Sequence, residues 1–466
     1  MKRIILILGA SLLAAAPARS QPLAEQPLLK ALAAEVSAER EQATDTRLVA
    51  FGTRHSASDT TSETRGVGAA RRWIAAQFEA LSKSCAGCLQ IETPEQTFTG
   101  QRFSQPTVIA DVLAIQRGTT DPDRVVVISA HIDTIASNVM DARIDAPGAN
   151  DDGSGVSAVM EAARLLSGRK FPATIVYAVL SGEEQGLYGG RVLADYAVAH
   201  GWRVEADLNN DIIGNIHGLG GAIDNTHVRV FSEGSRTTET AAQAVARHDA
   251  GGEEDSASRN IARFVQTLAD QYLSDLQVRM IWRPDRFRRG GDQREMLNQG
   301  FPAVRITEAE ENYTRQHQTV RVENGVRYGD VVEGVDFPYL AKVTRLNVIA
   351  LAALASAPEP PRGLVLGGAV TPNTTLKWTP SPGAAGYRVW WRDTTEPQWR
   401  FSRLTGPATD ATLQGVNVDN WFFGVSAIGP DGFESPVVFP GPSGSFERLP
   451  PSAPPAPLIL STPGGK

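Results

Sequence analysis

Cysteine is scarce in this sequence: only Cys85 and Cys88 occur among 466 residues. They form a C-x-x-C pair, which can be a redox motif, half of a zinc site or a small local disulfide. The strand-to-helix context of a redox centre is missing here. Export, argued below, favours the disulfide. Because the loop that the disulfide closes is short, we expect it to add only modestly to the stability of the fold.

The chain also lacks a basic surplus. Forty-five lysines and arginines stand against 52 aspartates and glutamates, for a net charge of -7. This balance gives no support to nucleic acid as a partner. The hydrophobic content of 42% provides for a sizeable core, and the length allows two or three domains.

A long apolar segment is found only near the start, in MKRIILILGASLLAAAPARSQ. The basic residues, the apolar run over 4–16 and the small residues after it predict a signal peptide over 1–20, cleaved after Ala18 or Ser20. An uncleaved anchor is the competing interpretation, but the run is shorter than the ~20 residues that span a bilayer. No later segment looks long and apolar enough to span. We therefore expect a periplasmic or extracellular protein without an integral membrane segment.

β-like runs alternate with helical ones over residues 21–356, which we interpret as one domain. Alternation of this kind predicts an α/β fold with a mostly parallel central sheet flanked by helices. The expected strands are 107–116, 124–130, 173–181, 204–210, 227–232 and 302–307, and the expected helices are 24–42, 64–82, 154–166, 187–200, 239–248, 261–276 and 339–355.

The composition changes at a proline-rich linker, 357–363, after which only short β-rich runs occur. Such runs at regular spacing predict a small all-β sandwich over 364–446. Trp378, the GYRV run at 386–389 and the FGVSA run at 423–427 are similar to a fibronectin type III module. The proline-rich tail, 447–466, is expected to be disordered.

Three further tryptophans fall in this β-rich region. We expect Trp378 to lie in its core, and Trp390, Trp391 and Trp399 to form a surface aromatic patch. Such a patch would allow contact with a surface or a glycan.

Polar residues follow the predicted strands, and in an open α/β sheet ligands bind at the carboxyl ends of the strands. Five separate segments would bring such residues to one edge: His131 and Asp133, the GANDDGSG stretch at 148–155, Glu183 with Glu184, Asp211, and His317.

Each of these residues also has an ordinary structural interpretation, such as a capping aspartate or a hydrogen-bonded histidine. Several carboxylates at one edge would, however, repel each other unless a cation lay among them. Two imidazoles and three carboxylates without thiolate suit zinc, with manganese and cobalt as alternatives. The set exceeds the needs of one catalytic zinc and fits two zinc ions that share a carboxylate.

The series H-x-D, G-A-x-D-D-G-S-G, E-E, N-D and a late histidine resembles the zinc-dependent exopeptidases with co-catalytic metals, clan MH, of the leucyl aminopeptidase and glutamate carboxypeptidase type. The resemblance covers roughly residues 45–356. It implies that one zinc takes His131 and Asp211, that the other takes Glu184 and His317, and that Asp151 bridges them.

The resemblance also implies roles for residues that do not bind metal. Glu183 would be the general base, and Asp133 would hold the ring of His131 in the right tautomer. A cis peptide between Asp151 and Asp152 is implied as well. At the end of the strand, the neighbouring side chains of Glu183 and Glu184 would point in different directions, which would separate their roles.

The chain departs from the family at two places. The S-D-H segment reads Gly291-Asp292-Gln293, and Gln316 precedes the last histidine where relatives often carry an aromatic residue. Transition-state stabilisation is therefore unassigned, with Tyr313 as a weak candidate. His55, in FGTRHSAS, is expected to be a packing residue.

The expected function is a secreted metallo-exopeptidase acting on peptides or proteins, of aminopeptidase type, although the sequence does not fix which end is recognised. Glutaminyl-peptide cyclisation on a single zinc is one alternative, and a non-catalytic binding or adhesion protein is another.

Overall fold

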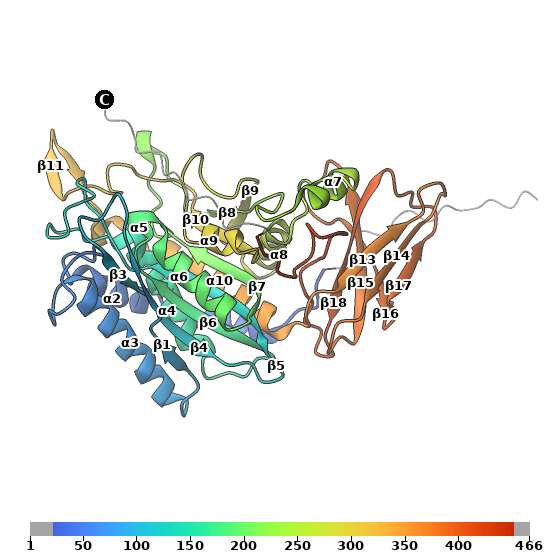
Figure 1. The fold of residues 1–466 in the computed structure, drawn as a ribbon, viewed down its shortest axis with the longest axis horizontal. Helices are drawn as coiled ribbons and strands as arrows, with labels where there is room; N and C mark the ends of the chain where they lie inside the picture. Colours follow the sequence, from blue (N-terminus) through green and yellow to red (C-terminus); the bar gives the residue numbers. More distant parts are fainter. Residues whose placement is uncertain (1–21, 452–466) are drawn as a thin grey trace, which may run out of the picture.

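The computed structural model describes residues 22–451. The predicted signal peptide and the tail beyond residue 451 lie outside this part of the chain. Figure 1 shows a larger α/β part, which carries the predicted site residues, beside a smaller β-rich part formed by the C-terminal strands.

An eight-stranded sheet in the order β1-β4-β6-β5-β7-β10-β8-β9 forms the centre of the larger part. Its four middle strands, β6, β5, β7 and β10, run parallel, whereas β1, β4 and β8 pair antiparallel with their inner neighbours. The predicted fold class is therefore confirmed. The strands are β1 (Gln90–Glu92), β4 (Val112–Gln116), β5 (Asp121–His131), β6 (Ala173–Leu180), β7 (Arg203–Asn210), β8 (His227–Phe231), β9 (Gln277–Ile281) and β10 (Ala303–Glu308).

Helices cover both faces of this sheet, as the continuous apolar runs of β5 and β6 require. The helices of the larger part are α1 (Pro27–Ala34), α2 (Ala38–Val49), α3 (Gly66–Ser84), α4 (Gly155–Leu166), α5 (Glu183–Gly186), α6 (Tyr188–Ala199), α7 (Ala241–Asp249), α8 (Ala257–Tyr272), α9 (Gln293–Asn298) and α10 (Phe337–Ser356). The described residues also include the π-helical turn η1 (Ala149–Ser154) and the 3₁₀ turns η2 (Leu219–Gly221) and η3 (Val332–Gly334).

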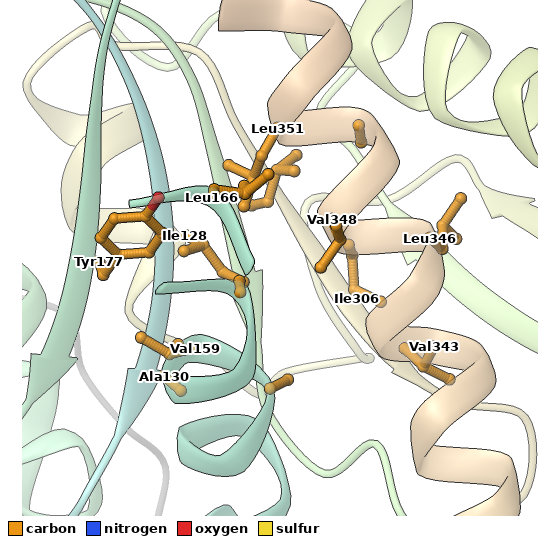
Figure 2. Close-up of a cluster of buried hydrophobic side chains, with 14 of the residues drawn as sticks. Ile128, Ala130, Val159, Leu166, Tyr177, Ile306, Val343, Leu346, Val348 and Leu351 are labelled. Atoms are coloured by element: carbon orange, nitrogen blue, oxygen red, sulfur yellow. The ribbon is translucent and has the colours of Figure 1, made fainter. Parts of the chain in front are cut away.

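Alternate residues of each strand belong to opposite faces. Figure 2 shows Ile128 and Ala130 of β5 and Tyr177 of β6 beside α4 and α10, within the larger apolar cluster. Val125 and Val127 instead pack with residues of α6 and α9 in a second cluster. These two layers hold the sheet rigid, and its carboxyl edge is left for polar residues.

Helix α10 corrects one expectation. By length and composition it is apolar enough to cross a membrane, although no such segment was expected after the signal. In the structure, 83% of its most apolar window is buried against the rest of the protein. We therefore interpret α10 as the core helix of the α/β part.

Three elements differ from their sequence predictions. The single helix expected over 24–42 is divided into α1 and α2, because Ser37 caps α2 by accepting a hydrogen bond from Arg40 N. The strand expected over 107–116 is split at Asp111, a buried residue whose carboxylate accepts from Ser181 N. Strand β9 was not predicted: the helix expected over 261–276 ends already at Tyr272, and the residues directly after the expected helix form the strand.

Small antiparallel elements complete the larger part. They are β2 (Glu95–Phe98) with β3 (Thr107–Ala110), and the hairpin of β11 (Arg321–Glu323) with β12 (Val326–Tyr328). Cys85 and Cys88, just after α3, are joined by a disulfide.

The C-terminal part consists of two three-stranded antiparallel sheets, β13-β14-β17 and β16-β15-β18. Trp378 lies in the apolar core between them, as predicted. The strands are β13 (Arg362–Gly367), β14 (Thr374–Thr379), β15 (Gly386–Asp393), β16 (Phe401–Gly406), β17 (Asp410–Leu413) and β18 (Trp421–Ile428).

The predicted surface patch of tryptophans is wrong, because all three rings are buried. Trp391 packs inside the β-rich part. Trp390 and Trp399 pack with Phe439, and Trp399 Nε1 donates a hydrogen bond to Asn260 Oδ1 of α8 at 3.1 Å. These aromatics therefore join the two parts of the chain instead of offering a free face.

A buried ion cluster reinforces this junction. The carboxylate of Asp255, before α8, accepts from both Arg263 of α8 at 2.9 Å and Arg392 of β15 at 2.7 Å. All three side chains are almost fully buried. Arg392 also binds Asp255 through both carboxylate oxygens, a geometry that fixes orientation.

The linker and the start of the tail are also bound to the larger part. Ala357, in the linker, is buried, and its carbonyl accepts from Arg124 at 2.7 Å. Disorder was expected from residue 447 onward, but Arg448 Nε donates to the carbonyl of Gln299 at 2.8 Å, and Leu449 N donates to Gly300 O at 3.2 Å. The tail residues up to 449 therefore lie in fixed positions.

We predict that Asp255→Asn lowers the free energy of unfolding by about 3 to 5 kcal/mol, because it leaves two buried guanidinium groups without their shared charge. Denaturant unfolding followed by tryptophan fluorescence measures this loss. A suitable control is Glu396→Gln, which breaks an exposed pair with Arg400 and should cost less than about 1 kcal/mol. Equal losses in both variants would show that the junction contributes no special stability.

Candidate active site

The carboxyl edge of the sheet brings together the residues predicted from the strand ends. His131 is the last residue of β5, Glu183 and Glu184 begin α5 just after β6, and Asp211 follows β7. Because β6, β5 and β7 are adjacent and parallel, these segments reach the same edge side by side. Asp151 enters through η1, and His317 lies in the loop after β10.

Two potential metal-binding groups form here and share one residue. His131, Asp151 and Asp211 make up the first group, and Asp151, Glu184 and His317 the second, with ligand atoms within 4.8 Å of one another in each. Asp151 Oδ1 lies 3.2 Å from His131 Nε2, and Asp151 Oδ2 lies 3.0 Å from His317 Nε2. The structure thus directs one oxygen of Asp151 to each group.

The donors fit metal ions. His131 Nε2 and Glu184 Oε1 are buried and have no hydrogen-bond partner among the described residues. Leaving such atoms unpaired is costly unless another group satisfies them. Imidazole nitrogens and carboxylate oxygens without sulfur are typical zinc donors. The side chain of His317 is 39% exposed, so the site is open to solvent on that side.

Electrostatics reflect this crowding of charges. Burial alone would lower the pKa of His131, but the carboxylates of Asp133, Asp151 and Asp211 outweigh burial and raise the pKa well above its usual range. Burial alone would raise the pKa of Asp151, but His131 and His317 outweigh burial and lower this pKa well below its usual range. The two histidines and Asp151 thus lie close enough to shift one another's pKa.

The two glutamates lie in a one-turn helix and not on a strand, which corrects the predicted reason for their different directions. The N-terminus of α5 is capped by Asp133, whose carboxylate accepts from Glu183 N at 3.2 Å and from Glu184 N at 3.1 Å. Consecutive residues of a helix point about 100° apart, so one side chain can face the metal group while the other does not. Burial raises the pKa of Glu183 to about 8.

Asp133 also contacts His131, but differently from the expectation. Its backbone carbonyl lies 3.1 Å from His131 Nδ1, whereas its carboxylate oxygen lies 3.6 Å away. The carbonyl can accept only if Nδ1 carries the proton, which leaves Nε2 free for a metal. One residue therefore orients the histidine and both glutamates.

The backbone of the loop that carries Asp151 is fixed by hydrogen bonds. A cis peptide links Asp151 to Asp152. The carboxylate of Asp330 accepts from Asn150 N at 2.9 Å and from Asp151 N at 2.7 Å, and the Arg54 guanidinium donates to the carbonyls that precede the loop. These contacts fix the backbone of the shared carboxylate.

Asp330 and Arg305 were not among the residues predicted from the sequence. Arg305, in β10, is fully buried, and its Nη1 lies 2.5 Å from Asp211 Oδ2. An arginine in the middle of an apolar strand was the available signal, since a buried guanidinium needs an acidic partner. Asp330 follows a surface hairpin and had no such signal.

The remaining predicted residues fall outside the ligand groups. Tyr313 is 56% exposed, and Gln316 is buried with its amide 3.5 Å from Glu311. His55 is buried, and its ring contacts Val139 O and Ala57 N, which confirms a packing role. Asp292 is buried, and its carboxylate accepts from Gly190 N at 2.9 Å.

Comparison with known proteins identifies the family. Residues 111–324 match Peptidase family M28. A probable zinc metalloprotease of Leptosphaeria maculans is 41% identical over 418 residues, covering 89% of this chain and 97% of that protein. Another, of Pyrenophora teres, is 40% identical over 421 residues, covering 89% and 87%.

Solved structures show the same fold. LapB of Legionella pneumophila has a TM-score of 0.52 at 18% identity, covering 72% of this chain and 76% of that one. LapA of the same organism has a TM-score of 0.51 at 20% identity, covering 72% and 79%. The chain therefore belongs to peptidase family M28 and is a zinc metallopeptidase.

Proposed function

We propose that the protein is a secreted exopeptidase, of aminopeptidase type, with two zinc ions and a glutamate general base. The observation that carries this proposal is the sharing of Asp151 between two donor groups. His131 and Asp211 would complete one ion's protein ligands, and Glu184 and His317 the other's. When bound, zinc would polarise the scissile carbonyl and make an attacking water more acidic.

Glu183 is the residue that moves the proton. It takes a proton from the attacking water and delivers it to the leaving amine. Its pKa of about 8, raised by burial, suits a group that must both accept and release a proton near neutral pH. Asp133 keeps Glu183 in place through the hydrogen bond to its backbone.

The charge around the site supports recognition of a free amino terminus. Glu183 and the buried Asp292 place carboxyl groups at this edge, and burial together with Glu183 raises the pKa of Asp292 well above its usual range. The nearby arginines are already compensated, since Arg286 pairs with Asp285 and Arg289 pairs with Glu311. A substrate carboxylate therefore finds no uncompensated cation among these residues, which favours a substrate whose recognised end is an amine.

We further propose that residues 364–446 form a fibronectin type III-like domain that supports the catalytic domain, 21–356. Two three-stranded sheets around Trp378 and the sequence pattern support this assignment. Because its aromatics and Arg392 are buried against α8, we assign the domain to structural support and not to glycan contact.

A panel of substrates tests the type of peptidase. We predict that aminoacyl-nitroanilides are hydrolysed and that N-blocked peptides react at least about 100-fold more slowly, because the blocked end cannot pair with the carboxylates. A chelator should remove the activity and added zinc should restore it. Release of residues from the carboxyl end of N-blocked peptides would contradict the aminopeptidase assignment. Cyclisation of amino-terminal glutamine without hydrolysis would indicate a cyclase.

The role of Glu183 is tested by Glu183→Gln. This variant should lose about 10²- to 10⁴-fold in kcat while binding the same number of zinc ions, because the amide can neither take nor deliver the proton. Elemental analysis counts the ions. The neighbouring variant Glu184→Gln is the contrast, since it should lower zinc occupancy as well as activity. Near-normal turnover by Glu183→Gln would disprove the mechanism.

Export is tested at the amino terminus. We predict that protein recovered from the periplasm or the medium begins at Arg19 or Gln21, because small residues stand before both bonds. The Cys85–Cys88 disulfide supports an oxidising compartment. N-terminal sequencing makes the measurement. A membrane-bound protein that keeps Met1 would contradict cleavage.

A further inference from the structure

We propose that Arg305 is a positioning residue for the metal site. Its guanidinium holds Asp211 so that this aspartate serves as a ligand through one carboxylate oxygen only. The inference rests on the proposed function in one respect, because it requires an ion in the group formed by His131, Asp151 and Asp211. It concerns residues of this chain outside the ligand set.

The two oxygens of Asp211 are divided between different partners. Oδ1 faces the metal group and lies 3.8 Å from His131 Nε2. Oδ2 lies 2.5 Å from Arg305 Nη1, and Arg305 Nη2 donates to the backbone carbonyl of Asp211 at 3.3 Å. The guanidinium thus holds both the side chain and the backbone of the ligand. With Oδ2 held in this way, only Oδ1 is left for an ion.

The guanidinium is itself fixed in a closed setting. Arg305 is fully buried, on strand β10, which pairs in parallel with β7 just before Asp211. Its Nη1 also donates to Gly290 O at 3.1 Å and lies 3.7 Å from Asp285 Oδ2. Asp285 in turn accepts from Gln293 Nε2 at 2.6 Å. A cation held by this many partners cannot move away when an ion binds to Asp211.

Gly291 explains how the chain makes room for this arrangement. A Cβ atom added at this position would lie 2.5 Å from Arg305 Nη1 and 3.2 Å from Asp285 Oδ2. The same atom would meet Gln293 Oε1 at 2.5 Å. Position 291 of the Gly291-Asp292-Gln293 segment therefore has to lack a side chain for Arg305 to reach Asp211.

The charge of Arg305 has a second consequence. Without a bound ion, the positive charge of Arg305 compensates the negative charge of Asp211. With an ion bound, the Asp211 carboxylate interacts with both the ion and the guanidinium. A charge-assisted hydrogen bond to a ligand's outer oxygen fixes its orientation, and loss of such contacts typically costs 10- to 100-fold in metal affinity. Only the group that contains Asp211 should depend on it.

Stepwise zinc binding to the full-length protein, measured in chelator-buffered titrations, tests the inference. Arg305→Met should weaken one of two binding steps by about 10- to 100-fold and leave the other within about threefold. It should also lower kcat more than it changes KM. Arg305→Lys, which keeps the charge but cannot span both contacts, should fall between Arg305→Met and the wild type.

Gly291→Ala tests the same contact without removing the arginine. It should weaken the same binding step, because the new methyl group displaces the guanidinium. A control is Gly168→Ala, whose Cβ would meet no atom within 4 Å, and it should bind zinc like the wild type. Gly291→Ala should add little further loss in an Arg305→Met background, because the two changes remove one contact.

The outcomes separate this inference from the proposed function. A wild-type protein that binds only one zinc would overturn the two-zinc proposal, and the role of Arg305 would then fall only if Arg305→Met left that single binding step unchanged. A wild-type protein with two zinc ions, matched by Arg305→Met in both steps, would overturn only the role of Arg305. Equal weakening of both zinc-binding steps in Arg305→Met would show a general structural role instead. Tighter zinc binding by this variant would show that Arg305 opposes the ion. Either result would overturn the positioning role of Arg305.

Discussion

The carboxylate of Asp151 is the constraint on which the rest of the site depends, because its two oxygens face two different histidines. His131 is fixed at the end of a buried strand, so its position is set by the sheet. His317 comes from a long loop and must be brought to the same carboxylate. The distances can hold only if the backbone of Asp151 is rigid, and Asp330 and Arg54 provide that rigidity from outside the donor groups.

The acidic residues around Asp151 also have fixed partners that compensate their charge. Acidic residues near the edge belong to a donor group, pair with a buried arginine, as Asp211 does, or accept from backbone N–H groups, as Asp133 and Asp292 do. Asp211 does the first two, since one oxygen faces the donor group and the other faces Arg305. Glu311 binds three arginines, Arg229, Arg286 and Arg289. A site rich in carboxylates can thus stay folded because nearly every charge has a fixed partner.

The C-terminal strands take part in the same structure. Their tryptophans and Arg392 pack against α8, and α8 lies against β9 and β10 of the central sheet. Strand β10 carries Arg305, so the β-rich part supports the layer from which the guanidinium reaches Asp211. A domain that looks like an accessory in the sequence is thus joined to the catalytic part through a buried ion cluster and aromatic packing.

Several features followed from the sequence by itself. Apolar runs and their alternation predicted the sheet, because strand and helix periodicities are local properties of the chain. The polar residues after those runs identified the edge and the donor set, since the ends of parallel strands meet. Only the tertiary structure decided that Trp390 and Trp399 are buried at the junction, that Glu183 and Glu184 lie in a helix capped by Asp133, and that Arg305 and Asp330 hold the ligands. These contacts join segments far apart in the chain, and their partners cannot be read from local pattern because three-dimensional packing selects them.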